Sequence, residues 1–553
     1  MKEILILLIV LSSFGFTLNV KVTRREHDCP FNRVHDTDSS LTAIRIDACG
    51  PRSVLGSAGK NICADTTGVN VAVEYNDYSG RPGKFAYLTP QGIRLFGPFG
   101  RSVARSYGGI DGRFNFGPLS DPIWGCWHEA YMRGGGYVDS SAQYVAFDEG
   151  GFPNGSFQVK MMPQSGNPAH NMWFTCIGVQ PDNPNIVYTT GVDYDFAAGG
   201  GKDIFGWRST DGGYNWLSPI LIVSGSATIG AHDAPHFRFG TGGYVFAYFQ
   251  RDTVVGIDTL IWPYYIESTD GGITWLPTNG KCFFTPSNPP PYPGYSLWWY
   301  NYDCEVIDNT PYVVLSPGIP GEHGDRIEFW KGSGPVGNRA WALTLLGGTT
   351  PPGIDSIVRE VSIASGKDIP RFDKSIAITA NISCSTSTDT RLWTSKDAGQ
   401  TWEFRGRLNI YASPEMAHIL SRHENLTSAI AHFVFEQANS IYYEWREIPN
   451  FTSGIHETKT VGPIAAGRLM ILQNPTRTAV RLQPAPSSGA RPGIADGSCR
   501  KLKIYDVSGK LVKDLSQSIV SGQWTIITLI PGIYFVRLEV ENEVITKKVV
   551  VVE

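Results

Sequence analysis

The sequence predicts an all-β protein, a β-propeller followed by a small C-terminal β-sandwich. Three observations predict this fold: an eight-residue phrase that recurs, paired strand-like runs that recur with it, and a final segment with a different pattern of alternating strands. The composition agrees, because 61 glycines and 36 prolines suit many short strands joined by tight turns. Hydrophobic residues make up 42% of the 553-residue chain, which is enough to bury a large core.

The chain begins with a pattern typical of a secretory signal peptide, which we predict for residues 1–17. Lys2 supplies the positive charge, Ile4 to Leu11 form an unbroken apolar run, and Ser13 and Gly15 supply small residues for cleavage. This apolar run is too short to span a bilayer. We therefore expect no transmembrane segment in the mature chain. The net charge of −4 gives no pull toward nucleic acid, so we expect no nucleic-acid partner.

The recurring phrase reads STDGGYNW at residues 209–216, STDGGITW at 268–275 and, more loosely, SKDAGQTW at 395–402. The second interval is close to twice the first, which indicates a period of about 60 residues. Degenerate copies fit this period at Asp148 and near residue 333, where the aspartate is lost. Repeats of this length made of short strands are typical of a β-propeller.

Each period also contains a pair of strand-like runs. We interpret each pair as the second and third strands of a blade, with the phrase as the turn into the fourth strand. Residues 30–448 are thus predicted to form seven blades, or six if the first and last copies merge. The pairs are VNVAVEYND with GKFAYLT, CWHEAYMR with SAQYVAFD, NIVYTTGVDY with KDIFGWR, YVFAYFQR with LIWPYYIE, TPYVVLS with RIEFWKG, SIAITANIS with TRLWTS, and SAIAHFVFE with SIYYEWREI.

The phrase itself is interpreted as scaffolding. Glycine permits positive φ in a tight turn, and Ser and Asp side chains hydrogen-bond to neighbouring backbone N–H groups. The tryptophan folds back into the blade and buries a large apolar surface. The predicted structural positions are Ser209, Asp211, Gly213, Trp216, Ser268, Asp270, Gly272, Trp275, Ser395, Asp397, Gly399 and Trp402.

The pattern S-x-D-x-G-x-T-W resembles the Asp box, or bacterial neuraminidase repeat, of sialidases and other secreted propellers. The resemblance implies the architecture more than an activity, because the same box occurs in sialidases, xyloglucan-degrading enzymes, sorting receptors and binding propellers. A sialidase would also carry three arginines that bind the substrate carboxylate, a Tyr–Glu pair that supplies the nucleophile and an Asp that acts as the catalytic acid. The segments around Arg45 and Arg94 do not fit the F-R-I-P-like motif of sialidases. Among the arginines, Arg359 is the best candidate for a substrate-binding arginine on an inner strand.

From about Leu469 the pattern changes. The runs KLKIYDV and IYFVRLEV predict strands of a β-sandwich over residues 469–553, after a linker at 449–468. The pieces QNP, KIYDVSGKLV, PGIYFVRL and TKKVVVV resemble the C-terminal sorting domain of the bacterial type IX secretion system. The resemblance implies that this machinery is a partner of the tail and that the protein is secreted or reaches the outer surface of a Gram-negative-type bacterium. An ordinary adhesion-type sandwich is the alternative.

The candidate binding residues lie on the rim opposite the recurring phrases, where longer loops meet. The connection TPSNPPPYPGYSLWWYNYD crowds aromatic residues, among them the candidates Trp298, Trp299 and Tyr300. Flat aromatic faces suit sugar rings or the apolar surface of a partner protein. The alternative is that these side chains pack over the blade edge. His232 and Asp233, in GAHDAPHF, are further candidates for ligand binding.

Candidates for catalysis are Asp303 and Glu305, which share one face of a predicted strand, together with Arg359. Two carboxylates at that spacing suit an inverting glycosidase. In a strand, His232 and His236 lie too far apart to share a metal ion, so no metal site is expected. No cofactor is expected either, because the chain lacks phosphate-loop and dinucleotide motifs.

The nine cysteines form no CxxC pair, and Cys282 and Cys304 are the nearest candidates for a disulfide. Taken together, the residues predict a secreted or cell-surface propeller that binds a glycan, a polymer or a protein through its loop-rich rim. The alternative function is that of a glycoside hydrolase with a carboxylate acid/base mechanism.

Overall fold

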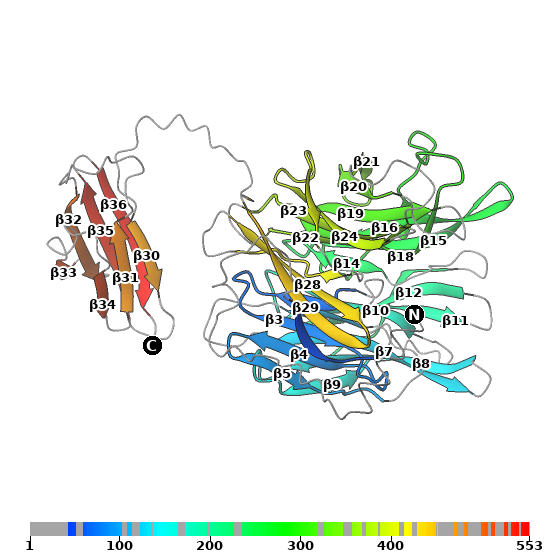
Figure 1. Cartoon of the computed structure of the whole chain (residues 1–553), viewed down its shortest axis with the longest axis horizontal. Coiled ribbons are helices and arrows are strands. Elements are labelled where there is room, and N and C mark those ends of the chain that lie inside the picture. The colour runs from blue at the N-terminus through cyan, green and yellow to red at the C-terminus, as the bar shows by residue number, and fades with distance from the viewer. Residues whose placement is uncertain are drawn as a thin grey trace, which may run out of the picture. The chain divides into compact units, whose positions relative to one another are not determined.

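The structure is a computed structural model. It describes residues 43–50, 59–101, 108–112, 122–133, 137–163, 172–195, 200–225, 235–318, 326–346, 357–367, 372–384, 387–408, 414–422, 428–449, 451, 469–473, 479–484, 499–506, 510–514, 525–528, 532–540 and 543–551. The predicted signal peptide at residues 1–17 lies outside these ranges. The propeller and the C-terminal strands belong to two separate compact units, divided after Ser453. All the elements in the described ranges are strands (Figure 1).

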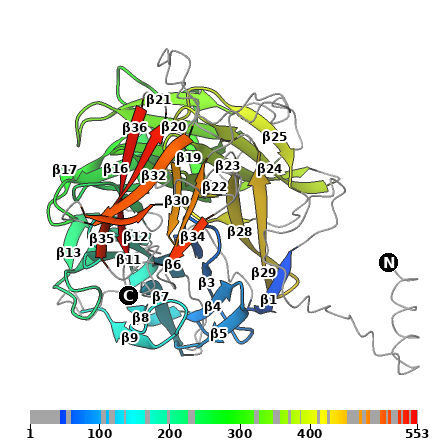
Figure 2. The same cartoon turned by 90° about the vertical axis from the view of Figure 1, so that its left-hand side faces the viewer.

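The described strands of the first unit form a seven-bladed β-propeller, as the sequence predicts. Each blade is an antiparallel sheet whose strands follow chain order from the axis outward, as blade 6 shows in Figure 2. Each of the seven predicted pairs forms the second and third strands of its blade. Blade 1 comprises β2 (Ile62–Ala64), β3 (Val71–Tyr75), β4 (Lys84–Thr89) and β5 (Gly92–Phe96), and blade 2 comprises β6 (Gly108–Gly112), β7 (Ile123–Arg133), β8 (Tyr137–Asp148) and β9 (Phe157–Met161). Blade 3 comprises β10 (Met172–Val179), β11 (Val187–Asp195), β12 (Gly200–Ser209) and β13 (Ile220–Val223), and blade 4 comprises β14 (His236–Phe239), β15 (Val245–Val255), β16 (Asp258–Ser268) and β17 (Leu276–Cys282).

The remaining blades follow the same plan, except that the last one borrows its outer strand. Blade 5 comprises β18 (Ser296–Ile307), β19 (Thr310–Gly318), β20 (Glu328–Ser333) and β21 (Ala340–Leu345), and blade 6 comprises β22 (Ile357–Ser365), β23 (Ile376–Cys384), β24 (Ser387–Ser395) and β25 (Glu403–Arg407). Blade 7 comprises β26 (Glu415–Met416), β27 (Ser421–Arg422), β28 (Ala429–Gln437), β29 (Ser440–Ile448) and β1 (Ile44–Ala48).

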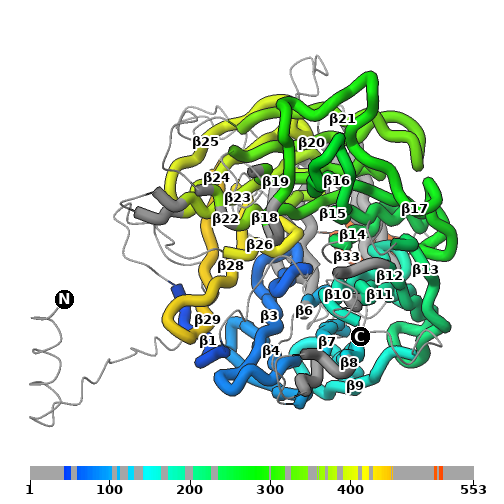
Figure 3. The backbone as a smooth tube through the Cα atoms, turned by 90° about the vertical axis from the view of Figure 1, so that its right-hand side faces the viewer, coloured from blue at the N-terminus to red at the C-terminus, as the bar shows by residue number. Residues whose placement is uncertain are grey.

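The ring closes through β1, which pairs antiparallel with β29 and places Ile44 opposite Tyr443. The first strand of the propeller thereby completes its last blade. In Figure 3 the colours run around the ring from blue to yellow and return to blue at β1. The sequence did not predict this closure, because the segment around Arg45 shows only the pattern of a short strand.

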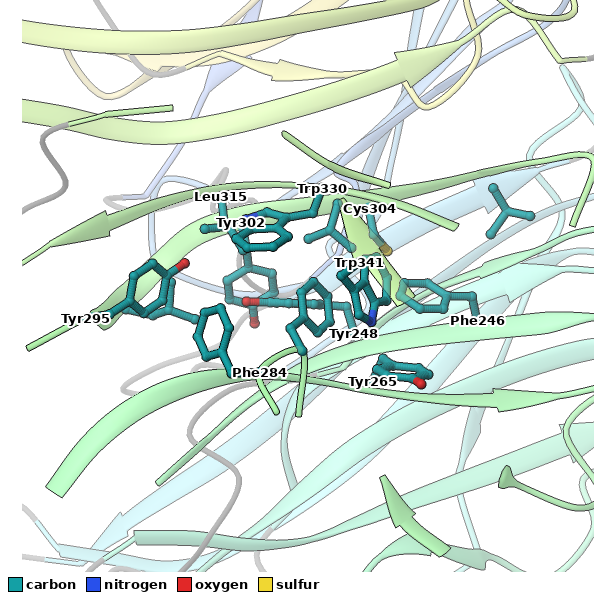
Figure 4. Packing of buried hydrophobic residues seen from close by; sticks show 14 of the residues in the cluster. Phe246, Tyr248, Tyr265, Phe284, Tyr295, Tyr302, Cys304, Leu315, Trp330 and Trp341 are labelled. Carbon is teal, nitrogen blue, oxygen red and sulfur yellow. The ribbon is translucent and has the colours of Figure 1, made fainter. Parts of the chain in front are cut away.

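The blades pack against one another through apolar cores. The core shared by blades 4 and 5 is rich in aromatic rings (Figure 4). Within it, Phe283 stacks on Trp341 with 3.7 Å between the ring centroids. Tyr295 and Tyr302, which belong to the predicted aromatic connection, are buried in this core. Tyr292 packs against it, with the Arg326 guanidinium 4.2 Å from its ring centroid. These three rings therefore support the blade, as the alternative interpretation expects.

The three recurring phrases form the turns between third and fourth strands. In the turn between β16 and β17, Ser268 Oγ donates to Asp270 Oδ1 (2.7 Å) and accepts from Gly272 N (2.9 Å). Asp270 Oδ1 accepts from Thr274 N (2.9 Å), and Trp275 Nε1 donates to Gly272 O (3.1 Å). Equivalent bonds occur in the turns that end at Trp216 and Trp402.

Glycine is required at the third fixed position of the phrase. Gly213, Gly272 and Gly399 have φ of 95°, 84° and 80°, in the left-handed region that other residues avoid. A Cβ on Gly272 would also lie 2.5 Å from the ring of Tyr188. The degenerate copy differs from expectation, because Asp148 does not occupy the aspartate position of the phrase. It is the last residue of its strand, β8, which is the position that the serine occupies in the three clear copies. Its carboxylate accepts from Gly155 N (2.9 Å) and Ser156 N (2.7 Å).

Replacing Trp275 by alanine should lower the free energy of unfolding by about 2–3 kcal/mol, because the indole packs into the core beside Tyr188. Denaturant unfolding of the full chain measures this loss. Retention of any ligand should stay nearly unchanged. Unchanged stability together with abolished ligand retention would contradict the scaffolding interpretation of the phrase.

Cys63, Cys126, Cys176, Cys282 and Cys304 are free thiols in the structure. The pairing considered for Cys282 and Cys304 is therefore wrong. Cys282 Sγ accepts from Phe284 N (3.3 Å), whereas Cys304 Sγ lies 3.5 Å from His236 O, at the propeller axis. The two thiols serve different parts of the core.

The C-terminal unit contains two antiparallel sheets. The three-stranded sheet has the order β30 (Leu469–Gln473), β31 (Ala479–Pro484), β34 (Thr525–Thr528). The four-stranded sheet has the order β33 (Leu511–Asp514), β32 (Cys499–Asp506), β35 (Gly532–Val540), β36 (Glu543–Val551). A search of the described residues for a helix with the length and apolar character of a membrane span finds none.

Candidate functional site

The inner strands of the blades bring distant parts of the sequence together at the propeller axis. These strands are β2, β6, β10, β14, β18, β22 and β26, and successive members contact one another around the ring. Their N-terminal ends lie beside the connections between second and third strands, on the rim opposite the recurring phrases. For example, Ile357 at the start of β22 pairs with Ser383, next to the β23–β24 hairpin. We call this end of the axis the channel mouth.

Three inner strands bulge in the half nearer the channel mouth. A bulge bends its strand and re-aims side chains, and bulges are frequent beside active sites. In these strands the regular pairing is interrupted between Trp173 and Cys176 of β10, between Leu297 and Tyr302 of β18, and between Arg359 and Val361 of β22.

Two bulged residues have a backbone conformation that is rare for their type. Phe174 in β10 has φ of 51° and Glu360 in β22 has φ of 37°. Left-handed conformations of residues other than glycine carry a strain of about 1–3 kcal/mol, and they cluster at ligand-binding and catalytic sites. The bulges therefore mark the channel mouth as the candidate functional site.

Asn301 joins the bulges of β18 and β22. Its Nδ2 donates to Val358 O (3.2 Å), and its Oδ1 accepts from Glu360 N (2.8 Å). The side chain is buried, so both backbones are held in a fixed relation. A single buried amide thus stabilises the strained conformation of Glu360.

This arrangement brings together four of the predicted site residues. Trp298, Trp299 and Tyr300 lie within the β18 bulge, and Arg359 precedes Glu360 in β22. Their strands are described, but their side chains lie outside the described part of the chain. Sequence reasoning missed Asn301 and did not single out Glu360, because no pattern of residue types marks a bulge.

The predicted catalytic residue Asp303 lies deeper in the axis, where it is only 1% exposed. Its carboxylate contacts side chains from blades 1, 4 and 6. The partners are Lys60 Nζ, Arg238 Nη2 (3.3 Å), His236 Nδ1 (3.4 Å), Ser362 Oγ (3.2 Å), Ile363 N (2.9 Å) and Cys304 N (2.8 Å). We call this set the axial hub.

The axial hub holds Asp303 in its charged form. Burial acts to raise the pKa of this carboxyl, but the charges of Lys60 and Arg238 and the hydrogen bond with His236 lower it well below its ordinary value. A carboxylate with so many donors has no free lone pair to accept a proton from a substrate. The geometry favours a structural role for Asp303 over the predicted catalytic role.

Glu305, the second predicted catalytic carboxylate, is fully buried as well. Its Oε1 accepts from Lys367 Nζ (2.8 Å) and from Val306 N (2.8 Å). The structure therefore places both predicted carboxylates on β18 but pairs each with a cation, the buried Lys60 for Asp303 and the partly buried Lys367 for Glu305. Neither is presented at the surface of the channel mouth.

A third carboxyl group, Glu415 of β26, adjoins the axial hub. Its Oε1 lies 3.4 Å from Lys60 Nζ and 3.4 Å from Ser362 Oγ. Burial, together with the charges of Asp303 and Glu360, raises the pKa of Glu415 to about 8, against the lowering effect of Lys60. Because Asp303 already neutralises Lys60, Glu415 holds its proton at neutral pH.

Gly59 and Lys60, just before β2, lie at the axis beneath the channel mouth. Gly59 N donates to His236 Nε2 (3.2 Å), and Lys60 O accepts from Ile110 N (2.6 Å). Gly59 has φ of 114°, and a Cβ there would lie 3.1 Å from Cys176 Sγ. Backbone and side chains thus fill the axis at this level and give the channel mouth a floor.

The other predicted binding residues, His232 and Asp233, lie outside the described residues. His236 is described, and it belongs to the axial hub rather than to a metal site. Among the residues that the structure describes, no group of three or more His, Cys, Asp or Glu side chains is placed to hold a metal ion.

Solved structures similar to this chain include carbohydrate-active enzymes and a lectin. An α-L-arabinanase of Penicillium chrysogenum in complex with arabinobiose is 10% identical, with 74% of this chain and 99% of that chain covered and a TM-score of 0.37. The polysaccharide lyase Uly1 is 10% identical, with 75% and 94% covered and a TM-score of 0.44. The fucose-specific lectin of Aleuria aurantia is 12% identical, with 65% and 97% covered and a TM-score of 0.34.

At this level of similarity the activities of those proteins say nothing about this chain. No curated protein matches the chain. The C-terminal unit is better defined, because residues 474–552 match the family model of the secretion system C-terminal sorting domain. The chain therefore carries the sorting tail of type IX secretion and is a secreted protein whose first compact unit is a seven-bladed β-propeller.

Proposed function

We propose that this protein binds an extracellular glycan at the channel mouth, where the bulges of β18 and β22 meet. The observation that carries the proposal is the pair of hydrogen bonds from Asn301, which hold a strained Glu360 beside the strand that contains Trp298, Trp299 and Tyr300. A strained backbone conformation of this kind persists only where the surrounding structure holds it in place, and such conformations cluster at functional sites.

The residue types at the channel mouth suit a sugar ligand. Tryptophan and tyrosine combine a flat apolar face with a polar edge, which matches the alternating apolar and hydroxyl surfaces of a pyranose. Binding sites join such surfaces to a few polar groups that fix orientation, and Arg359 and Glu360 offer charges of both signs. A soluble polymer or a protein with similar chemistry is the other class of ligand that this surface would fit.

The axial hub supports this site from below. Side chains that contact a ligand keep their positions only when the residues behind them are held rigidly. Asp303 and Ser362 follow the two bulges closely in sequence and are tied to the opposite side of the ring through Lys60. The hub therefore fixes the distance between β18 and β22.

The proposed domain organisation brings the propeller to the outside of the cell, where it can meet such a ligand. Residues 1–17 direct the chain across the inner membrane, residues 30–448 form an Asp-box propeller, and residues 449–468 link it to a β-sandwich at 469–553. The type IX machinery reads this tail and delivers the propeller to the outer surface of a Gram-negative-type bacterium or to the medium. Glycans outside the cell are then the accessible ligands.

Alanine variants at Trp298, Trp299, Tyr300 and Arg359 test the site. The purified full chain is passed over a panel of immobilised glycans and polymers, and the affinity for the retained member is measured. At least one of these variants should weaken binding about tenfold or more. Tyr78→Ala is the matched control, because Tyr78 is an exposed aromatic residue on the same rim in blade 1. Equal effects of the control and the site variants would contradict the proposal.

A glycoside hydrolase is the second candidate function, favoured by one observation. Glu360 is half-buried at the channel mouth, and its charge helps to raise the pKa of the Glu415 carboxyl group, after burial and the charge of Asp303. A protonated and an ionised carboxyl group in one site are what acid/base hydrolysis requires. Turnover of aryl-glycosides that is lost in Glu360→Gln with binding retained would establish this activity, whereas no turnover across the panel would exclude it.

A further inference from the structure

Lys60 and Asp303 of the axial hub, together with the adjoining Glu415, have the arrangement of an amide-forming site. Lys60 Nζ, from blade 1, contacts Asp303 Oδ2, from blade 5, and lies 3.4 Å from Glu415 Oε1, from blade 7. The exposed fractions of the three side chains are 2%, 2% and 6%. A buried amine in contact with a carboxyl group, with a carboxylic acid beside both, holds the reactants and a proton carrier together and excludes water.

We propose that Lys60 and Asp303 are joined by an intramolecular amide bond, formed by the folded protein itself with Glu415 as the proton carrier. The lone pair of Lys60 Nζ attacks Asp303 Cγ, a C–N bond forms and the bond from Cγ to Oδ2 breaks. The ammonium group loses two protons, both of which leave with that oxygen as one molecule of water. Glu415 gives up one proton, receives another and returns to its starting state, so neither an oxidant nor a co-reactant is needed.

Ser362 is placed to relay these protons. Its Oγ lies 2.9 Å from Lys60 Nζ, 3.2 Å from Asp303 Oδ2 and 3.4 Å from Glu415 Oε1. The hydroxyl group therefore touches the nucleophile, the leaving oxygen and the proton carrier at once. Ile363 N also donates to Oδ2 (2.9 Å) and stabilises the charge that develops on it.

The surroundings can satisfy the polar atoms of the product. The amide N–H would donate to Ile363 O, which Lys60 Nζ already reaches at 2.9 Å. The remaining carbonyl oxygen, Oδ1, keeps Cys304 N at 2.8 Å and Arg238 Nη2 at 3.3 Å. Because a buried amide is stable only when it is hydrogen-bonded, this match is an independent requirement that the site meets.

Condensation would also relieve an electrostatic cost. A buried ion pair is only partly compensated for the loss of water around its two charges, and an amide bond removes both charges together. Arg238 remains in the field of Glu305 and Asp111, so its own charge keeps carboxylate neighbours. The ionised state of Asp303 requires that the departing protons come from Lys60, as the relay through Ser362 and Glu415 allows.

The bond would serve as a covalent brace for a secreted protein. It would close a loop between positions 243 residues apart and tie blade 1 to blade 5 across the axis. Cys63, Cys126, Cys176, Cys282 and Cys304 supply no such brace, because they are free thiols. A cross-link constrains the unfolded chain more strongly when the loop that it closes is longer.

Mass spectrometry of the purified full chain tests the proposal. We expect the denatured protein to be lighter than its sequence mass by one water molecule. Trypsin should release residues 53–84, uncleaved after Lys60, joined to residues 282–326. The full sequence mass with normal cleavage after Lys60 would overturn the proposal. A mass deficit confined to a single linear peptide would overturn it as well, because a cyclic imide gives the same loss.

Two variants separate the bond from the ion pair. Lys60→Arg keeps the positive charge but cannot form the amide, so its full mass and normal digestion are expected. Glu415→Gln removes the proton carrier and should lower the linked fraction severalfold. Lys367→Arg is the matched control, because this lysine pairs with Glu305 in the same axis and should leave the linked fraction unchanged. Complete linkage in Glu415→Gln would contradict the assigned role of Glu415.

Discussion

Replacing Asp303 by alanine is expected to lower the free energy of unfolding of the propeller by at least about 3–5 kcal/mol, the range for a buried ion pair that loses one partner, and loss of the proposed amide bond to Lys60 adds to this. The substitution leaves Lys60 and Arg238 buried at the axis without the carboxylate that both contact. It also removes the acceptor of Ile363 N. The inner strands of blades 1, 4, 5 and 6 lose their shared anchor.

Denaturant unfolding of the full chain, followed by tryptophan fluorescence, measures this loss. Asp258→Ala is the control, because Asp258 is an exposed aspartate at the tip of the β15–β16 hairpin. The control should change the free energy of unfolding by less than about 0.5 kcal/mol. A fully stable Asp303→Ala protein that loses an enzymatic activity would restore the catalytic interpretation of this residue.

Glu415→Gln is expected to gain stability relative to the parent protein as pH rises. Burial raises the pKa of Glu415 to about 8 in the folded state, above the ordinary value of 4.5. The folded protein therefore binds this proton more tightly than the unfolded chain between these two values. The stability linked to that proton is present at low pH and is lost as pH rises through about 8.

The difference in unfolding free energy isolates this effect when both proteins also carry Lys60→Arg, because neither can then form the proposed amide bond and all other titrating groups are shared. It should change by about 1 kcal/mol between pH 7 and pH 8, in favour of the variant. Glu403→Gln, at an exposed position of β25, should show no such change over this range. A difference independent of pH would show that Glu415 is already ionised at neutral pH.

The blades could be predicted from the sequence because their signals are local. Two apolar runs joined by a polar loop define the second and third strands, and the phrase ending in Trp216, Trp275 or Trp402 defines the turn that follows. Gly272 and its counterparts must have positive φ, so the residue type reveals the conformation. These features depend on neighbouring residues alone, and they favoured seven blades while leaving six open.

The closure of the ring and the axial hub depend on contacts between residues far apart in the chain. β1 is a short strand whose partner lies at the other end of the propeller, and nothing in its residues identifies that partner. Lys60 stands in an ordinary stretch of sequence, yet it meets Asp303 and Glu415 at the axis. Only the assembled ring brings such groups together.

The candidate site also combines residues that stand out in the sequence with backbone features that only the folded ring produces. Its aromatic residues Trp298 and Trp299 stood out by composition, and Arg359 stood out as an arginine on an inner strand. The bulges that bring their strands together are backbone features set by the packing of neighbouring blades. Asp303 and Glu305 were considered for catalysis because a strand places them on one face, but burial and cation partners are properties of the closed ring.

The most direct test of this account is hydrogen exchange of the full chain with and without the glycan that the panel retains. If the channel mouth binds the ligand, protection should increase in residues 296–301 and 357–361, and the turns at 209–216, 268–275 and 395–402 should exchange as before. Protection confined to those turns, with the two bulged strands unchanged, would contradict it.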